Sequence, residues 1–505
     1  MPGGIINVAV NSSQLNQQAE QHFDILIVGA GISGINAAYH LKDQCKDKTF
    51  AMLEVQDSFG GTWHTHKYPG IRSDSDLYTF GYKWKPWSGP PIAKADEILK
   101  YLGESLDEND LQQHIRFSHQ VKSAEWSTEN KCWTLGVSVG GSDELQTFTC
   151  NFLWMCQGYY RHSEGYTPDF PGSENFKGEI IHPQTWPEDL DYKGKKVVVI
   201  GSGATAATLI PSMADDCEHI TMLQRSPTYF AARPNKNELV DTLRQLEVSD
   251  EWIHEIARKQ VLAEQKKVTQ RSFEDPDGLK KDLLGAAKMF LGDDFDVDKH
   301  FTPSYRPWRQ RLAFVPDGDM FKAIRSGNAS VVTDTIDTFT EAGIKLKSGE
   351  ELEADIIITA TGFNMSILGD IEFIIDDEKL DFGKTWAHRG ILFSGIPNMA
   401  WVFGYLRTSW TMRSDLVSDF VCRLLNHMDE KGVNMVTPHL REEDKSMPEL
   451  PFVDPENFNA GYLLRDMDKM PIQGDRQPWV FSQDYYAEKT EIPEADLEDG
   501  TLIYK

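Results

Sequence analysis

A chain of 505 residues exceeds what a single hydrophobic core usually serves, so we expect at least two domains. The net charge of −27 at pH 7 argues against a nucleic-acid partner, because phosphate binding needs clustered Lys and Arg. No apolar run approaches the length of a membrane span, so no stable membrane anchor is expected. The six cysteines are scattered without a CxxC pair, which argues against a disulfide scaffold, a zinc site and a dithiol reductase. They favour a reducing cytoplasmic setting.

The chain opens with residues 1–22, a polar segment without the basic start or cleavage site of a signal peptide, which we expect to be a frayed tail. It continues as FDILIVGAGISGINAAYHL, a strand, a GxGxxG turn and a helix, and the next apolar strand ends at Glu54. In such a turn two glycines let a pyrophosphate approach the backbone, the third lets helix and strand pack, and the acid accepts from ribose hydroxyls. The pattern predicts a dinucleotide site at Gly29, Gly31, Gly34 and Glu54. A GxGxxG without these surroundings would be only a packing turn.

The segment KKVVVIGSGATAATL repeats this order, with Gly201, Gly203 and Ala206 forming GxGxxA. The following strand, HITMLQ, leads into Arg225 and Ser226, where an NAD site would carry an acid. An arginine can pair with a 2′-phosphate that a carboxylate would repel, so the second site is predicted to bind NADP(H). The alternative is an arginine that merely ends a surface strand.

One site with an acid and one with an arginine together suggest FAD and NADPH on an α/β chain. The loop with Gly61, Thr62 and Trp63 and the later turn with Thr361 and Gly362 are expected to contribute further FAD contacts. The predicted fold therefore has two Rossmann-like dinucleotide-binding domains, with the NADP domain inserted into the FAD domain. We expect the FAD domain in two segments, 23–165 and 353–505, and the NADP domain at 191–352. A linker is expected at 166–190, and a solvated helical excursion within the NADP domain at about 236–300.

Two long motifs lie between the nucleotide turns. FKGEIIHPQTWP, Phe176 to Pro187, fits FxGxxxHxxxW followed by Pro, and GGTWHTHKYPGIRSD, Gly60 to Asp74, fits [A/G]GxWxxxx[F/Y]P[G/M]xxxD in register. Together they resemble the fingerprints of the type I Baeyer–Villiger monooxygenases. Related flavin-containing monooxygenases carry Tyr or Phe in place of Trp186. Nearly the whole chain after the tail is similar to the ethionamide-activating subgroup of that family.

The resemblance implies an NADPH- and O2-dependent FAD enzyme that converts ketones to esters or lactones through a C4a-peroxyflavin and also oxygenates thioethers. The family places an arginine beside the anionic peroxide, and the matching segment RPWRQRL points to Arg311. The resemblance also implies that Asp74 orients this arginine within the cofactor site and that His182 has a conformational role. The alternatives are a structural ion pair for Arg311 and core packing for Trp63 and Trp186.

Gln310 stands where several members of the family have a Lys that helps to hold the 2′-phosphate. Preference for NADPH would then rest on Arg225 and Ser226, and NADH could be tolerated. The histidines show no metal-ligand spacing, and no metal is proposed. Two other classes stay open: a flavin-containing or N-hydroxylating monooxygenase acting on amines or sulfides, and a flavoprotein that does not oxygenate. The expected substrate is a small hydrophobic ketone or thioether of unspecified identity and regioselectivity, and the oligomeric state is not specified either.

Overall fold

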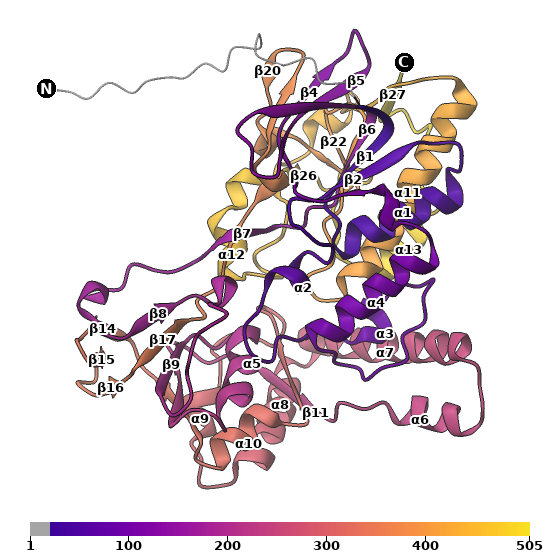
Figure 1. Cartoon of the computed structure of the whole chain (residues 1–505). Helices are drawn as coiled ribbons and strands as arrows, with labels where there is room; N and C mark the ends of the chain where they lie inside the picture. Colours follow the sequence, from indigo (N-terminus) through magenta and orange to yellow (C-terminus); the bar gives the residue numbers. More distant parts are fainter. Residues whose placement is uncertain (1–20) are drawn as a thin grey trace, which may run out of the picture.

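The protein folds into two α/β lobes, which the computed structural model describes for residues 21–505 (Figure 1). The larger lobe contains a nine-stranded sheet, and the smaller lobe contains a five-stranded one. The predicted fold, two Rossmann-like domains with one inserted into the other, is confirmed. Most of the predicted N-terminal tail lies outside the described residues, and the first strand begins at Gln21, two residues earlier than predicted.

The larger sheet has the strand order β20-β19-β4-β5-β6-β1-β2-β3, with β23 also paired to β6. Alternate residues of β1 enter two cores: Ile25 and Ile27 pack toward the helices, whereas Leu26 and Val28 pack toward the opposite face. Both faces are covered, so all four side chains are buried, as expected for a central parallel strand. The strands of this sheet are β1 (Gln21–Val28), β2 (Phe50–Leu53), β3 (Ile115–Arg116), β4 (His119–Ser127), β5 (Cys132–Val139), β6 (Leu145–Met155), β19 (Glu372–Ile375), β20 (Glu378–Lys379) and β23 (Met399–Trp401).

The smaller sheet has the order β13-β10-β9-β17-β8 and is parallel throughout. Its strands are β8 (Glu179–Ile181), β9 (Lys196–Ile200), β10 (His219–Gln224), β13 (Ala329–Thr333) and β17 (Ile356–Thr359). The chain leaves the larger lobe through β7 (Tyr160–Gly165) and returns through β18 (Phe363–Met365), and these two strands pair antiparallel. The connection between the lobes is therefore a two-stranded crossover.

Two predicted boundaries need correction. Strand β8 falls inside the predicted linker 166–190 but forms the edge of the smaller sheet, and β17 falls inside the predicted segment 353–505 but pairs with both β8 and β9. The apolar run of β17 is buried because it lies between two parallel neighbours in the smaller lobe. The chain changes lobe at the crossover of β7 and β18 rather than near residue 352.

Residues 236–300 form helices outside the two main sheets, and most of their side chains are exposed or half-buried, but part of one helix is buried. The longest helix, α7 (Asp250–Glu274), packs against the larger lobe. Arg258 is 5% exposed, donates to the Gly81 carbonyl over 2.9 Å and pairs with Asp415 at 3.3 Å. Because a buried arginine and an exposed one look alike in a charged helix, the sequence pattern could not reveal this contact. The other helices of the segment are α6 (Glu238–Gln245), α8 (Pro276–Leu291) and α9 (Val297–Phe301).

The remaining helices and strands flank these sheets (Figure 1). The helices are α1 (Ile32–Gln44), α2 (Thr62–Thr65), α3 (Leu77–Phe80), α4 (Ala95–Glu108), α5 (Ala204–Met213), α10 (Asp319–Arg325), α11 (Trp410–Lys431), α12 (Gly461–Arg465) and α13 (Tyr485–Glu491). The short strands are β11 (Phe230–Arg233), β12 (Ala313–Pro316), β14 (Ile336–Phe339), β15 (Gly343–Leu346), β16 (Glu351–Glu353), β21 (Ala387–His388), β22 (Leu392–Phe393), β24 (Val436–Pro438), β25 (Leu450–Pro451), β26 (Ile472–Gln473) and β27 (Leu502–Tyr504).

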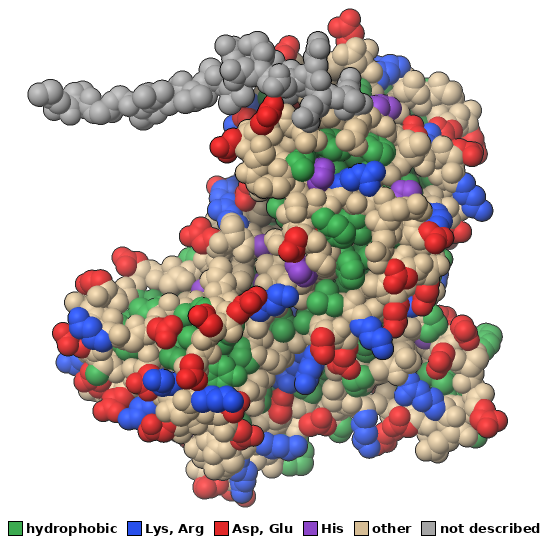
Figure 2. All heavy atoms as spheres, viewed as in Figure 1, with side chains coloured by type: hydrophobic (Ala, Val, Ile, Leu, Met, Phe, Trp, Pro, Cys, Tyr) green, Lys and Arg blue, Asp and Glu red, His purple; other side chains and the backbone are tan. Residues whose placement is uncertain are grey.

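The surface carries acidic and basic side chains interspersed over the face that Figure 2 shows. Within residues 21–505, no helix has both the length and the apolar character needed to cross a membrane. All six cysteines lie in this range, and none of them forms a disulfide.

Candidate active site

The first nucleotide turn joins β1 to α1 and depends on backbone that only glycine tolerates. Gly29 has φ of 101°, and a Cβ there would lie 2.9 Å from the Cys156 carbonyl oxygen. A Cβ at Gly34 would lie 1.9 Å from the Gly29 carbonyl oxygen, so the helix can pack on the strand only without a side chain. Helix α1 starts after Gly31 without a side-chain cap, which leaves its first N–H groups free for a phosphate.

Glu54 lies directly beside this turn. The side chain is buried, with one carboxylate oxygen accepting from the Ala30 N–H at 2.7 Å and the other from the Gln56 N–H at 2.9 Å. Desolvation raises the pKa of Glu54, and the two N–H donors oppose that rise. The carboxylate is therefore held in one orientation next to the free helix N-terminus, an arrangement that fits the ribose and pyrophosphate of a dinucleotide.

The predicted loop Gly61, Thr62 and Trp63 also adjoins the first turn. The Gly60 N–H donates to the Ala30 carbonyl at 3.0 Å, and Thr62 begins the short helix α2. Trp63 packs edge-on against Phe80, with ring centroids 5.8 Å apart. Trp63 therefore has the packing role that was one of the alternatives for it.

Thr361 and Gly362 follow β17 of the smaller sheet and were predicted to approach the first nucleotide. The Thr361 hydroxyl donates to the Tyr166 carbonyl at 2.6 Å, and the neighbouring Ala360 carbonyl lies beside Gly201 of the second turn. Among the described contacts, nothing joins the pair to Gly29. They sit at the crossover between the lobes.

The second nucleotide turn joins β9 to α5 in the same way. Gly201 has φ of 131°, and a Cβ there would lie 2.3 Å from the Ala360 carbonyl oxygen. Gly203 precedes α5, has no capping side chain and faces open space. Ala206 is fully buried against the sheet. A second uncapped helix N-terminus is thus available to a phosphate.

The end of β10 separates an inward side chain from two outward ones. Gln224 is buried and donates to the His300 carbonyl at 2.6 Å and to the Thr333 hydroxyl at 2.8 Å. Arg225 and Ser226 are exposed, and within residues 21–505 the Arg225 guanidinium has no hydrogen bond or ion pair. An unpaired arginine beside a free helix N-terminus fits a 2′-phosphate.

Arg311 and Asp74 form a bidentate ion pair between the lobes. Arg311 Nε donates to Asp74 Oδ2 at 2.6 Å and Nη2 donates to Asp74 Oδ1 at 2.5 Å, while Nη1 has no hydrogen-bond partner in the described part of the chain. Desolvation opposes the charge on Arg311, but the carboxylate outweighs it, and the pKa of Arg311 lies well above its usual value. The side chain keeps 39% of its surface exposed, so a fixed cation faces accessible space. The two predicted catalytic residues are therefore brought together.

Three tyrosines near this pair were missed in the sequence. The Tyr159 hydroxyl donates to that of Tyr160 at 3.0 Å and lies 3.5 Å from that of Tyr462. Burial raises the pKa of Tyr160, while the charge of Arg311 opposes the rise. The adjacent pair YY after β6 was a visible signal, but nothing in the sequence placed Tyr462 beside it.

His182 braces the crossover. Its Nε2 lies 3.1 Å from the Gly362 carbonyl, its Nδ1 accepts from the Gln184 N–H at 3.2 Å, and a Cβ at Gly165 would lie 2.0 Å from the ring. The ring therefore packs on the last residue of β7 and bonds to the residue before β18. Burial lowers the pKa of His182, so the ring is neutral in this contact. A conformational role fits this position better than proton transfer.

The motif Gly60 to Asp74 also contacts the smaller lobe through residues that precede Asp74. Arg72 pairs with Asp319 at the start of α10 at 2.5 Å and donates to the Ala207 carbonyl of α5 at 3.4 Å. Tyr68 packs in the core of the smaller lobe, and a Cβ at Gly70 would lie 1.8 Å from the Ser212 hydroxyl. The motif therefore connects the first nucleotide turn to the second lobe.

Across residues 21–505, the structure contains no cluster of three or more His, Cys, Asp or Glu side chains that could hold an ion.

Comparison with known proteins assigns the family. A family model described as flavin-binding monooxygenase-like matches residues 23–243. The FAD-containing monooxygenase EthA of Mycobacterium tuberculosis H37Rv is 46% identical over 486 residues, covering 96% of this chain and 98% of that protein. The probable FAD-binding monooxygenase AlmA of Acinetobacter baylyi is 45% identical over 491 residues, covering 96% of each chain.

Solved structures agree in fold. An oxidized steroid monooxygenase bound to NADP superposes with a TM-score of 0.76 at 22% identity, covering 96% of this chain and 99% of that one. An open structure of cyclohexanone monooxygenase gives a TM-score of 0.73 at 18% identity, covering 96% and 100%. Sequence identities of 18–22% show only that the fold is shared. The near-complete alignment with EthA at 46% identity shows that the two proteins belong to one family. The chain belongs to the flavin-binding monooxygenases, alongside the EthA proteins.

Proposed function

We propose that the protein is an NADPH- and O2-dependent Baeyer–Villiger monooxygenase that converts ketones to esters or lactones and also oxygenates thioethers. The Arg311–Asp74 pair is the observation that carries the proposal. A fixed guanidinium between two dinucleotide turns suits a reaction in which negative charge develops on oxygen away from bulk water.

Each of the two nucleotide turns would hold one of the two cofactors. The α1 N-terminus and Glu54 would hold FAD, and the α5 N-terminus with Arg225 and Ser226 would hold NADPH. When bound, FAD reduced by NADPH supplies the activation of O2 that no side chain of the protein can provide.

The residues around this chemistry then have separate tasks. Arg311 stabilises the developing negative charge through its unshared Nη1, and Asp74 fixes the guanidinium plane by two hydrogen bonds. His182 and the Arg72–Asp319 pair hold the NADPH lobe against the FAD lobe. We also propose that the protein is located in the cytoplasm, and the absence of disulfides among the six cysteines, all within residues 21–505, supports this.

The test is a product screen of purified protein with NADPH, O2, a linear ketone, a cyclic ketone, a thioether and a primary amine. Wild type should give one ester or lactone per NADPH oxidised. Arg311→Ala should lower the ester yield by roughly 10²-fold or more, because one fixed donor to developing charge is lost, while NADPH still reduces the flavin.

Two variants distinguish the alternatives. Arg311→Lys keeps the charge without the bidentate geometry and should fall between wild type and Arg311→Ala. Unchanged ester formation in Arg311→Ala would remove the residue from the mechanism. A wild-type protein that oxygenates amines and sulfides but no ketone would instead be an N- or S-oxygenating flavin monooxygenase.

A further inference from the structure

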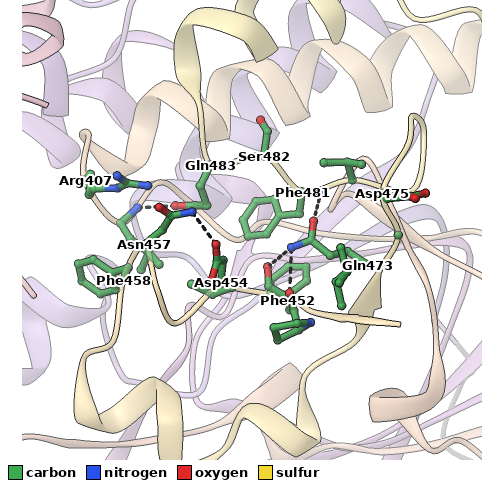
Figure 3. Close-up of a pocket in the computed structure, with 16 residues that line it drawn as sticks. Arg407, Phe452, Asp454, Asn457, Phe458, Gln473, Asp475, Phe481, Ser482 and Gln483 are labelled. Carbon is green, nitrogen blue, oxygen red and sulfur yellow. Dashed lines mark hydrogen bonds between the residues drawn. The ribbon is translucent and has the colours of Figure 1, made fainter. Parts of the chain in front are cut away.

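A cavity of about 480 Å³ opens in the C-terminal part of the larger lobe (Figure 3). Three segments wall it, 406–407, 450–458 and 473–483. Eight apolar residues line it: Leu406, Leu450, Pro451, Phe452, Val453, Phe458, Val480 and Phe481. Leu450 is 38% exposed, whereas the three phenylalanines are almost fully buried behind the wall. Such a lining suits an apolar chain of a ligand.

Most polar side chains in the wall already serve the backbone. Gln473 donates to the carbonyls of Pro451 and Phe452 and accepts from the Phe481 N–H. Gln483 accepts from the Leu406 N–H at 2.8 Å and donates to the Gly404 carbonyl at 2.9 Å. These amides hold the wall in shape and have little capacity left for a ligand.

The acids of the wall are engaged in the same way. Asp454 accepts from the Glu456 N–H at 2.9 Å and from the Asn457 amide at 2.7 Å, and Asp475 accepts from Arg476 at 3.2 Å. Behind the wall, Asp484 accepts from the Tyr486 N–H at 2.9 Å and caps α13.

Arg407 differs from these groups. It lines the cavity, is half-buried, and makes no hydrogen bond or ion pair with any residue that the structure describes. Its guanidinium lies 5.5 Å from the Phe273 ring centroid, and that of Arg306 lies 4.1 Å from the same centroid. The Arg306 guanidinium donates hydrogen bonds to the carbonyls of Pro307 and Glu456. Desolvation and the neighbouring Arg306 lower the pKa of Arg407, and the charges of Asp484 and Asp454 oppose this only in part, so a bound anion would offset the remaining cost.

The cavity borders the candidate active site. The wall segment ends at Phe458, and the next residue, Asn459, donates its N–H to the Arg309 carbonyl at 2.9 Å. Tyr462 reaches Tyr159, the tyrosine bonded to Tyr160. A substrate bound here is therefore separated from the Arg311 loop by a single segment.

We propose that this cavity binds the carboxylate end of an amphipathic substrate, with Arg407 as its ion-pair partner and the accessible apolar part of the wall, chiefly Leu450, beside its carbon chain. The inference rests on the proposed function and narrows the substrate class to oxo-acids, that is, ketones carrying a carboxylate several carbons away. Esterification of that carboxylate removes the charge while keeping the chain, and this supplies the test.

The experiment compares a straight-chain oxo-acid with its methyl ester and with a neutral ketone of the same length. Wild type should prefer the oxo-acid in kcat/KM. Arg407→Gln should lower kcat/KM for the oxo-acid on the order of 10–100-fold, since a charge-assisted pair is lost, with little change for the ester, the ketone or the KM for NADPH. Arg271→Gln, which removes a surface arginine of α7 with its two ion pairs, is the matched control and should leave the preference intact.

A second measurement does not depend on turnover. A saturated alkanoate should raise the Tm of the holoenzyme more than the corresponding alkanol, and Arg407→Gln should abolish that difference while Arg407→Lys retains part of it. An equal loss for oxo-acid and ester, no loss for either, or a raised KM for NADPH with every substrate would overturn the proposal. If wild type makes no ester from any ketone yet the alkanoate shift persists, the proposed function fails and the anion site stands.

Discussion

The two nucleotide turns share one topology and differ at the end of their second strand. In the larger lobe, β2 leads into Glu54, a buried carboxylate fixed by two backbone N–H groups. In the smaller lobe, β10 ends at Gln224, which is tied inward, and the next side chain is the unpaired Arg225. One site is thus prepared for hydroxyl donors and the other for an anion, although both have an uncapped helix N-terminus.

The third position of each motif differs as well. Gly34 packs so closely on the Gly29 carbonyl that no side chain fits, whereas the second turn accepts Ala206 as a buried residue. The first helix therefore approaches its strand more tightly. Steric contact therefore restricts the first position of both turns, but the third position only in the turn of the larger lobe, and the two turns differ further in the charge that follows the second strand.

The largest expected effect comes from crowding the tighter turn. In Gly34→Ala the new Cβ would meet the Gly29 carbonyl at 1.9 Å, which requires the helix or the turn to shift. Overpacking of this kind costs about 1–3 kcal/mol, and we expect the protein to be purified with most of its flavin missing. Flavin content by absorbance and Tm by calorimetry measure the loss.

The matched change in the other turn is Ala206→Gly. It should lower stability by only about 1 kcal/mol, through helix propensity, and leave flavin content unchanged. Full flavin occupancy in Gly34→Ala would show that the turn relaxes and would remove the proposed steric difference.

A middle-sized effect is expected from the unpaired arginine. Arg225→Ala should raise the KM for NADPH by roughly 10–100-fold, because a charge-assisted phosphate contact on the order of 1.5–3 kcal/mol is lost, while the KM for NADH stays close to that of wild type. Steady-state kinetics with both nucleotides measure the ratio. Equal changes for NADPH and NADH would mean that Arg225 only ends a surface strand.

A conservative variant refines this result. Arg225→Lys should recover part of the preference for NADPH, and Ser226→Ala should cost less than Arg225→Ala, since a neutral hydrogen bond contributes about 1 kcal/mol. Because Gln310 supplies no charge, a strong remaining preference in Arg225→Ala would point to another cation nearby.

Local patterns in the sequence anticipated the turns and their order but not the contacts between distant segments. GxGxxG and GxGxxA each report a constraint within a few residues, so both turns were predictable. The pairing of β17 with β8 and β9 moved a lobe boundary because a short apolar run does not identify its neighbours. Arg311 and Asp74 are 237 residues apart, and only the family resemblance joined them before the structure did. Arg407 carried no sequence signal, since being unpaired is a property of its surroundings.

The smallest expected effect concerns Glu54. Glu54→Gln keeps the shape but places an amide NH2 against one of the two backbone N–H donors, so one of these hydrogen bonds is lost together with the charge. We expect FAD to bind about fivefold more weakly at pH 8, in line with about 1 kcal/mol for one hydrogen bond. Burial raises the pKa of Glu54, so the folded apoprotein keeps its proton to higher pH than the unfolded chain does. The contribution of Glu54 to apoprotein stability therefore falls as pH rises through that raised pKa.

FAD affinity should rise over the same interval, because ribose hydroxyls donate to the ionised form. Fluorescence titration of FAD from about pH 4.5 upward should show this slope in wild type and a flat profile in Glu54→Gln. If both proteins show the same slope, another group controls FAD binding and the carboxylate only supports the turn.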